Sequence, residues 1–352
     1  MLEFLPARAT GDHARIPIGA AIKETEMLAS IRHARGVSAL ALFALSAAAA
    51  AVDLTVTHFG TGMYGAPFAV ARDKGFFKEV GIDVTGFITS DGGGTTIRNA
   101  LASEIPYGEV ALPAAIAAIQ QGVELTIIHA GVVSVSDQVW ISRKDDTRIT
   151  KISDLKGKKL GYSSPKSVTD MVTTMMLNAN GLTGQVERKS VGGIGAGLTA
   201  LRESAVDMTY VTEPVWSKER NNYRLVFNSA DWAPHITQTV GIIKTDYLKK
   251  NPDKVRAIIN ARRKGVDYLV KNPDESAKIL AREYKIDEAA AKSAIASILA
   301  VKGVYWSPGR FDMEGMNEML KGLVLVKAID AGPFDWSKVM DESYLPADQR
   351  GK

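Results

Sequence analysis

The chain has 352 residues, 46% of them hydrophobic and 23% charged, which is the composition of an ordinary folded protein. A formal net charge of +4, with no basic cluster, argues against a nucleic-acid-binding surface. The absence of cysteine excludes disulfides, thiolate metal sites and a cysteine nucleophile.

The first 51 residues have the pattern of an export signal. A short basic segment precedes an apolar run at 36–52, and small residues suited to signal cleavage lie near 49–51. The run is shorter than the ~20 residues that span a bilayer. We therefore expect 1–51 to be an extension and signal peptide, with translation starting at Met27, and the rest to be a soluble exported protein. An uncleaved membrane anchor is the alternative.

From residue 53 onward, short β-branched runs alternate with glycine-rich turns and segments of helical periodicity. This alternation predicts an α/β fold with a mostly parallel sheet that helices cover on both faces. The expected elements, in chain order, are strand 53–59, helix 66–77, strand 83–89, helix 95–103, strand 107–112, helix 113–122, strands 125–132 and 138–145, a short helix at 153–155, strand 158–163, helices 167–182 and 197–204, strand 206–211, helix 213–221, strand 223–229, an extended segment at 237–245 and further helices.

The order of these elements predicts two lobes. Two α/β units follow one another, and a helical tail then returns to the first unit. We expect lobe 1 at 52–138 plus 240–352 and lobe 2 at 139–239. The extended segments 138–145 and 237–245 are the candidate hinge strands.

Four strand-to-helix turns are candidate binding positions, because ligands of open α/β sheets lie beyond the carboxyl ends of strands. They are 61–64, 91–96, 163–170 and 212–216, and three of them are rich in Gly, Ser and Thr. Backbone N–H groups and hydroxyls at a helix N-terminus suit an anionic group.

The second turn, Asp-Gly-Gly-Gly-Thr-Thr at 91–96, is not a nucleotide loop. No lysine follows Gly94, as a P-loop requires, and three contiguous glycines do not match the dinucleotide spacing. Two interpretations stay open. The turn is a tight turn with a helix cap, or its bare N–H groups contact a ligand.

The third turn carries more hydroxyls than capping requires. Ser164 before Pro165 is expected to cap a helix, and Ser167 with Asp170 fits a capping pair. Two or three hydroxyls beside a helix start indicate a site for an oxyanion. In the fourth turn, Glu213 either stabilises the first turn of a helix or contacts a cationic or donor group of the ligand.

Ordinary structural roles are available for the other polar and aromatic residues. Trp216 and Tyr64 either wall a cleft or pack in the core, and a structural role is favoured for His58. Arg98 and Arg143 could meet an anion, although a solvated or hinge-pairing role fits them better. No nucleophile elbow or zinc-protease motif is present in the sequence, which favours binding over catalysis.

Four segments of the chain resemble one known family. "PFAVARDKGFFKEVGIDV", "ITKISDLKGKKLGYS", "ALRESAVDMTYVTEPVW" and "YLKKNPDKVRAIINA" are similar, in this order, to segments of the alkanesulfonate-, taurine- and nitrate-binding proteins of ABC importers. This NMT1/THI5-like family is related to thiamine-pyrimidine synthases. Ser204-Ala205 stand where a glycine is common, so that turn departs from the pattern.

The resemblance implies a type II periplasmic-binding-protein fold whose two lobes close on a small molecule. It implies a monomer that delivers this ligand to an inner-membrane permease and its ATPase, with no catalytic residue, metal or cofactor. The ligand-binding positions carried over are Thr61, Gly62, Met63, Tyr64, Gly93, Gly94, Thr95, Ser163, Ser164, Ser167, Val168, Thr169, Glu213 and Trp216.

The ligand and one other function stay open. A sulfonate, an aromatic acid or another carboxylate suits the hydroxyl-rich turns, whereas Glu213 favours a taurine-like zwitterion or a thiamine-precursor pyrimidine. The second class is an enzyme on the same fold. A pyrimidine synthase is excluded because its cysteine-rich motif cannot occur here, and a chorismate-dehydratase-like protein is typically cytosolic, whereas this chain has an export signal.

Overall fold

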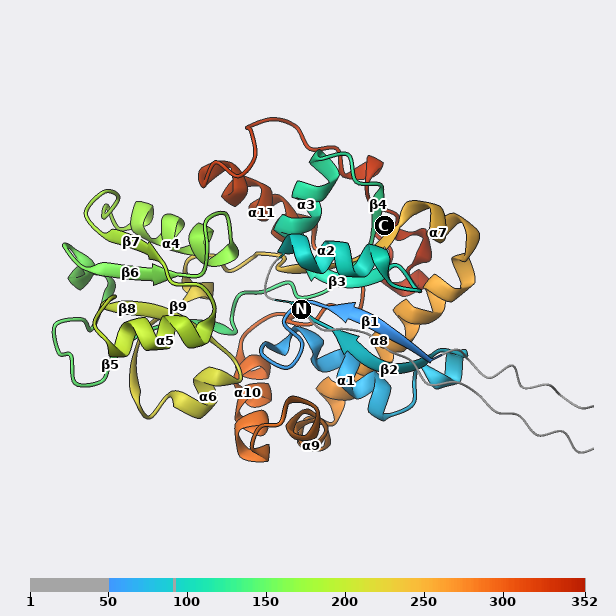
Figure 1. Cartoon of the computed structure of the whole chain (residues 1–352), viewed down its shortest axis with the longest axis horizontal. Coiled ribbons are helices and arrows are strands. Elements are labelled where there is room, and N and C mark those ends of the chain that lie inside the picture. Colours follow the sequence, from blue (N-terminus) through green and yellow to red (C-terminus); the bar gives the residue numbers. More distant parts are fainter. Residues whose placement is uncertain (1–50, 91–92, 352) are drawn as a thin grey trace, which may run out of the picture. The chain divides into compact units, whose positions relative to one another are not determined.

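The computed structural model describes residues 51–90 and 93–351 (Figure 1). The expected signal peptide and the Met27 start fall outside these residues, apart from Ala51, and so do Asp91 and Gly92. Within the described ranges no helix has both the length and the apolar character needed to cross a membrane.

The first sheet has five strands, four of them from the first part of the chain. They are β1 (Ala51–Val56), β2 (Asp83–Ile88), β3 (Tyr107–Ala111), β4 (Leu125–Ala130) and β10 (Thr239–Lys244), in the order β2-β1-β3-β10-β4. β1 pairs in parallel with β2 and β3, whereas β10 runs antiparallel to β3 and β4.

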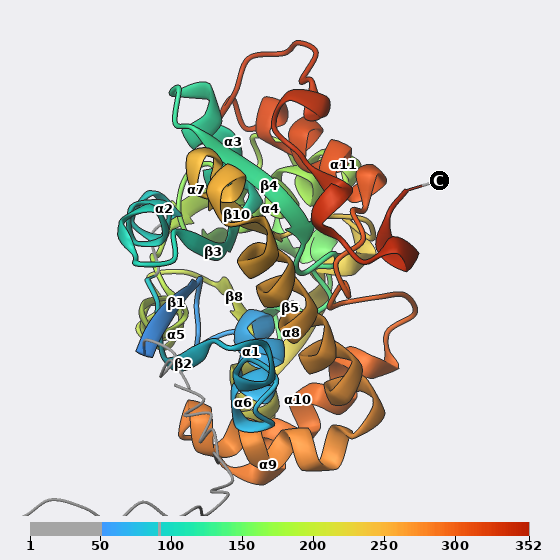
Figure 2. The same ribbon diagram turned by 90° about the vertical axis from the view of Figure 1, so that its right-hand side faces the viewer.

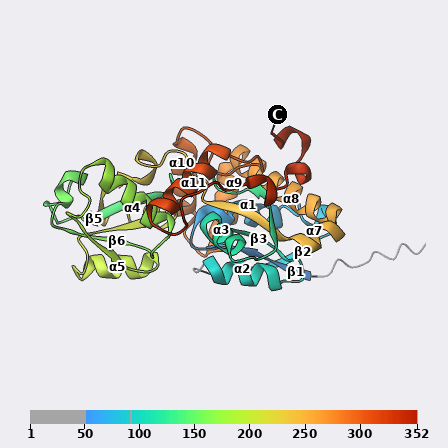
Figure 3. The same ribbon diagram turned by 90° about the horizontal axis from the view of Figure 1, so that it is seen from above.

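Helices cover both faces of the first sheet. They are α1 (Ala66–Asp73), α2 (Gly93–Ala102), α3 (Leu112–Gln120), α7 (Thr245–Lys250) and α8 (Pro252–Lys271). Figures 1 and 3 show α2 and α3 on one face and α1 and α8 on the other. The alternation of strand residues explains this, because Ile242 belongs to the core on the α2–α3 side and Ile243 to the core that contains α1 and α8.

The second sheet repeats this arrangement. Its strands are β5 (Gln138–Arg143), β6 (Lys159–Tyr162), β7 (Glu187–Ser190), β8 (Met208–Thr212) and β9 (Tyr223–Asn228), in the order β7-β6-β8-β5-β9. β6 is parallel to β7 and β8, and β5 is antiparallel to β8 and β9. The helices are α4 (Val168–Ala179), α5 (Ile194–Arg202) and the short α6 (Val215–Glu219). α4 and α5 cover opposite faces (Figures 1 and 3).

The last helices pack against both groups of elements. They are α9 (Pro273–Tyr284), α10 (Glu288–Ala300) and α11 (Met313–Leu325). α10 contacts both α9 and α6, as Figures 1 and 2 show, and α11 contacts α3 and α4. Asp253, Asp274 and Asp287 lie in the first turn or at the N-cap of their helices, where a carboxylate is favoured.

Each sheet is mixed, but four of its five strands run in the same direction, in agreement with the expected mostly parallel sheet; β10 in the first sheet and β5 in the second run against their two neighbours. Two expectations about local structure are wrong. Strand β7 was not expected, since Glu-Arg-Lys-Ser is a polar edge strand without apolar alternation. The first strand ends at Val56, and His58, expected to end it, adopts a φ of 50° in the turn that follows.

The chain passes between the sheets twice, at 131–137 and at 229–238. These connections are joined to each other near their ends, because Gln238 N donates to Val132 O at 2.7 Å and Val132 N donates to Thr239 Oγ1 at 2.7 Å. The segments expected as hinges, 138–145 and 237–245, are mostly the regular strands β5 and β10. The connections between the sheets come just before these two strands in the chain.

Candidate functional site

The turn after β1 points mainly into the core. The side chains of Met63 and Tyr64 are buried, and Met63 O accepts a hydrogen bond from Trp306 Nε1 at 2.8 Å. Tyr64 Oη donates to Gln238 Oε1 at 3.1 Å. Gly62 is buried, whereas Thr61 is exposed. In this turn Thr61 is the candidate residue whose side chain is accessible to a ligand in this conformation.

The turn before α2 has a packing role that the sequence did not indicate. A Cβ on Gly93 would lie 2.7 Å from the Cβ of Ala114, so only glycine lets α2 approach α3 this closely. Gly94 has more room, with Arg98 Nη1 at 3.6 Å as the nearest atom. Thr95 is exposed and accepts a hydrogen bond from Arg98 Nη2 at 2.9 Å, so Arg98 pairs within its own helix.

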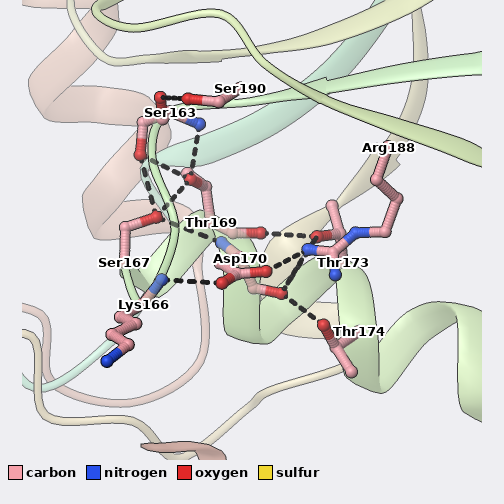
Figure 4. A network of polar contacts seen from close by, with 9 residues as sticks. All are labelled: Ser163, Lys166, Ser167, Thr169, Asp170, Thr173, Thr174, Arg188 and Ser190. Atoms are coloured by element: carbon pink, nitrogen blue, oxygen red, sulfur yellow. Dashed lines mark hydrogen bonds and ion pairs between the residues drawn. The ribbon is translucent and has the colours of Figure 1, made fainter. Parts of the chain in front are cut away.

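The turn before α4 contains three hydroxyls in mutual contact (Figure 4). Ser163 Oγ lies 2.7 Å from Thr169 Oγ1 and 2.9 Å from Ser167 Oγ, and the last two atoms are 2.9 Å apart. We call these three side chains the hydroxyl triangle. Each hydroxyl proton can rotate from its neighbour to an incoming anion while the oxygen stays in place.

The start of α4 confirms one capping expectation and corrects another. Ser167 is the N-cap, and its Oγ accepts from Asp170 N at 3.2 Å, as the Ser-x-x-Asp pattern predicts. Ser164 does not cap, because α4 begins only after Ser167, and Ser164 is exposed. Val168, the first helical residue, is half-buried against the core.

An ion pair holds this turn in place. Asp170 forms a salt bridge with Arg188 of β7, and its other carboxylate oxygen accepts from Lys166 N at 2.7 Å. Arg188 Nη2 also donates to Thr173 Oγ1 at 2.8 Å, and its guanidinium lies 4.6 Å from the centre of the Tyr162 ring. Because Arg188 balances Asp170, an anion at the hydroxyl triangle would not face an uncompensated carboxylate.

The site around the hydroxyl triangle has the features of an anion-binding turn. Ser163 and Ser167 are half-buried, and α4, with 12 residues, directs the positive end of its dipole toward the hydroxyl triangle. Arg188 was missed by sequence reasoning because its strand has no apolar pattern.

Glu213 is buried at the end of β8, with an exposed fraction of 1%. Its Oε2 accepts from Ser217 N in α6 at 3.0 Å, so the helix-stabilising interpretation holds for one oxygen. Burial raises the pKa of Glu213, and the neighbouring Ser217 and Ser297 hydroxyls partly offset that rise. Trp216 is half-buried against the core of the second sheet.

Arg143 lies apart from these turns. Its guanidinium donates to Leu201 O, near the end of α5, at 3.1 Å and to Ser204 Oγ, on the connection to β8, at 2.7 Å. These contacts give Arg143 a structural role within the second sheet's group of elements.

A buried polar cluster between the sheets was missed. Gln238 lies at its centre and donates to Asp137 Oδ1 at 2.9 Å and to Ser134 O at 2.6 Å. Gln138 Nε2 donates to Gln238 Oε1 at 2.7 Å. Burial raises the pKa of Asp137 to about 7. Polar residues at the starts of two buried strands were the available signal, but their meeting depends on contacts about a hundred residues apart.

Among residues 51–90 and 93–351, no three His, Asp or Glu side chains are grouped to hold a metal ion. The described polar clusters consist instead of hydroxyls, amides and carboxyls.

Comparisons with known proteins point to one family. The sequence model described as NMT1/THI5 like matches residues 63–276. YtlA of Bacillus subtilis, which is named as a binding protein, is 25% identical over 222 residues, and the alignment covers 60% of this chain and 65% of YtlA.

Solved structures of periplasmic binding proteins share the fold of this chain. The periplasmic aliphatic sulphonate binding protein SsuA of Escherichia coli has a TM-score of 0.68 at 13% identity, covering 82% of this chain and 96% of SsuA. The periplasmic nitrate-binding protein NrtA of Synechocystis PCC 6803 has a TM-score of 0.66 at 15% identity, covering 85% of this chain and 90% of NrtA.

Proposed function

The chain belongs to the NMT1/THI5-like family and has the fold of periplasmic binding proteins, and from that premise we propose that it is the solute-binding component of an ABC importer. In this proposal it captures a small organic anion between lobe 1 (52–138 plus 240–352) and lobe 2 (139–239). The protein is periplasmic and monomeric, has no catalytic activity, and delivers its ligand to an inner-membrane permease and its ATPase.

The hydroxyl triangle is the observation that carries this proposal. Three hydroxyls and a helix N-terminus converge on one partly exposed turn of the second sheet, and an ion pair fixes that turn. A sulfonate or carboxylate placed there would accept charge-assisted hydrogen bonds, which are stronger than neutral ones. The remaining proposed contacts come from Thr61 and from the turn at 93–95.

A ligand that also carries an amine is the second candidate, and Glu213 favours it. Its Oε1 has no hydrogen bond among the described residues, whereas an ammonium group or an aminopyrimidine could donate to it. Because this oxygen is shielded from solvent, such a contact requires the lobes to separate before the ligand enters.

A thermal-shift screen tests the proposal. The probes are butanesulfonate, taurine, benzoate, nitrate and 4-amino-2-methylpyrimidine, each at a large excess. A ligand that binds only the folded protein raises the midpoint of unfolding by several degrees at about 100 times its Kd. We expect butanesulfonate or benzoate to do so. A rise with the pyrimidine alone would contradict the anion assignment, and mass spectrometry of the protein as purified would show a ligand that copurifies.

A further inference from the structure

The two connections between the sheets bury a carboxyl group without a basic partner. Asp137 ends the first connection and is fully buried, with an exposed fraction of 0%. Its Oδ1 accepts from Gln238 Nε2 at 2.9 Å, and no basic side chain among the described residues hydrogen-bonds or ion-pairs with it. A carboxylate in this position is poorly solvated, so the protonated form is favoured.

The groups around Asp137 come from both sides of the connections. Tyr64, in the turn after β1, and Tyr305, after α10, belong to the first sheet's group of elements. Burial, and secondly the nearby Asp137, raise the pKa of both phenols. Glu213, at the end of β8, belongs to the second sheet's group, and Glu213 N donates to Asp137 O at 2.9 Å.

The wider electrostatic surroundings contain more acid and phenol than base. Tyr210 contributes to the raised pKa of Tyr64, and Tyr284 contributes to the raised pKa of Tyr305. Arg220, the C-cap of α6, lowers the pKa of Glu213, against the larger rise caused by burial. No arginine or lysine is among the main influences on Asp137, whose pKa is raised by burial and by Glu213 and lowered by the hydrogen bond from Gln238 and by the nearby Tyr305 phenol.

We propose that closing the two lobes takes up a proton at Asp137, so that acid favours the closed form and alkali favours the open form. The inference rests on the proposed function in one respect, which is that the lobes move about the connections at 131–137 and 229–238. Proton uptake is then a property of the chain itself and does not depend on which ligand it binds.

The direction follows from hydration. In the proposed opening, Tyr64 and Tyr305, which belong to the first sheet's group of elements, move away from Asp137, and water reaches the carboxyl. Its pKa then falls from about 7 toward the ordinary 3.8. Between these values the closed form holds a proton that the open form has lost. The ratio of closed to open molecules is therefore about tenfold higher at pH 6 than at pH 8.

Distance measurement between two spin labels tests this inference without a ligand. The chain has no cysteine, so Gln121→Cys and Lys156→Cys place one exposed label beside each sheet. Dipolar spectroscopy at pH 6 and pH 8 then gives the closed and open populations. We expect the ratio of closed, short-distance molecules to open, long-distance molecules to be about tenfold higher at pH 6 than at pH 8. Identical distance distributions at the two pH values would overturn the inference.

Two matched variants identify the group. In the labelled protein, Asp137→Asn should favour the closed form, and its ratio of closed to open molecules should be nearly independent of pH, because the amide imitates the protonated acid. Asp145→Asn changes an exposed acid, 87% exposed at its side chain, and should keep the full pH dependence. An unchanged pH dependence in Asp137→Asn would contradict the assignment.

A second measurement covers the case in which Asp137→Asn does not fold. Carbon NMR of the unsubstituted protein, labelled at its aspartate carboxyls, should show one resonance that titrates near pH 7. Its absence would overturn the inference. Failure of the proposed function is a separate result, since it would be seen as no probe binding in the thermal-shift screen while these titrations remain measurable.

Discussion

Glu109 in the first sheet and Asp137 between the sheets are equally buried, but only Glu109 has a basic partner. Arg262 Nε donates to Glu109 Oε2 at 2.6 Å, Thr239 Oγ1 donates to Glu109 Oε1 at 2.9 Å, and Arg262 itself is 1% exposed. Asp137 instead faces amides, phenols and Glu213. A buried charge with a fixed partner holds a structure together, whereas a buried acid without one responds to pH.

The same contrast separates the two turns that precede long helices in each sheet. In the first sheet, Gly93 serves close packing of α2 on α3. In the second sheet, the turn before α4 gathers three hydroxyls that can redirect their protons. The two sheets share one strand order, so these differences lie in side chains rather than in topology.

The largest expected effect is the loss of the buried ion pair. Arg262→Met leaves Glu109 charged and unpaired in the core, which should lower the free energy of unfolding by about 3–5 kcal/mol. Urea denaturation at pH 7 measures it. The neighbouring Arg263→Met removes an exposed pair with Asp348 and should cost less than about 1 kcal/mol. Equal losses in both variants would show that the buried ion pair contributes no more to the free energy of unfolding than the exposed pair does.

The next effect concerns Asp137 and depends on pH. The folded protein binds the Asp137 proton more tightly than the unfolded chain does, so stability falls as pH rises from the ordinary carboxyl pKa through 7. Asp137→Asn lacks this proton. From pH 5 to pH 8 the wild type should therefore lose about 2.5 kcal/mol relative to the variant. Denaturation at both pH values measures this, and parallel curves would contradict the raised pKa.

A pair of glycine substitutions tests the packing role of the first sheet's turn. Gly93→Ala places a methyl group against Ala114 and should destabilise by about 1–3 kcal/mol. A Cβ at Gly94 would make only an ordinary contact, 3.6 Å from Arg98 Nη1, so Gly94→Ala should be neutral or stabilise by up to about 1 kcal/mol, because alanine favours helix. Thermal unfolding of both variants gives the comparison, and a stabilising Gly93→Ala would mean that α2 can move away from α3.

The smallest effect tests the cap of α4. Ser167→Ala removes the acceptor for Asp170 N and should cost about 1 kcal/mol. Ser164→Ala alters an exposed hydroxyl outside the triangle and should stay within about 0.5 kcal/mol. The reverse order would restore Ser164 as the capping residue.

Local patterns in the sequence predicted what local physics determines. The Ser-x-x-Asp spacing located the N-cap of α4. The helix expected at 66–77 was found as α1, although it ends at Asp73, before Gly75 with its φ of 75°. The alternation of strands and helices, together with the family resemblance, gave the α/β fold class and the family.

Contacts between residues far apart in the chain could not be predicted from these local patterns. The cluster at Asp137 forms because Gln238, about a hundred residues later, returns beside it. Arg188 lies on a polar edge strand whose sequence has no strand signal, so its pairing with Asp170 was not foreseen. The antiparallel direction of β5 and β10 depends on how the chain crosses between sheets, which periodicity does not report.

Calorimetric titration with the anion that gives the largest thermal shift tests the binding account most directly. Thr169→Val keeps the shape of the side chain and removes a hydroxyl of the triangle, while Thr174→Val makes the same change more than one turn further along α4. We predict that Thr169→Val binds about tenfold more weakly than wild type and that Thr174→Val binds normally. Equal affinities for wild type and Thr169→Val would contradict an anion site at the hydroxyl triangle.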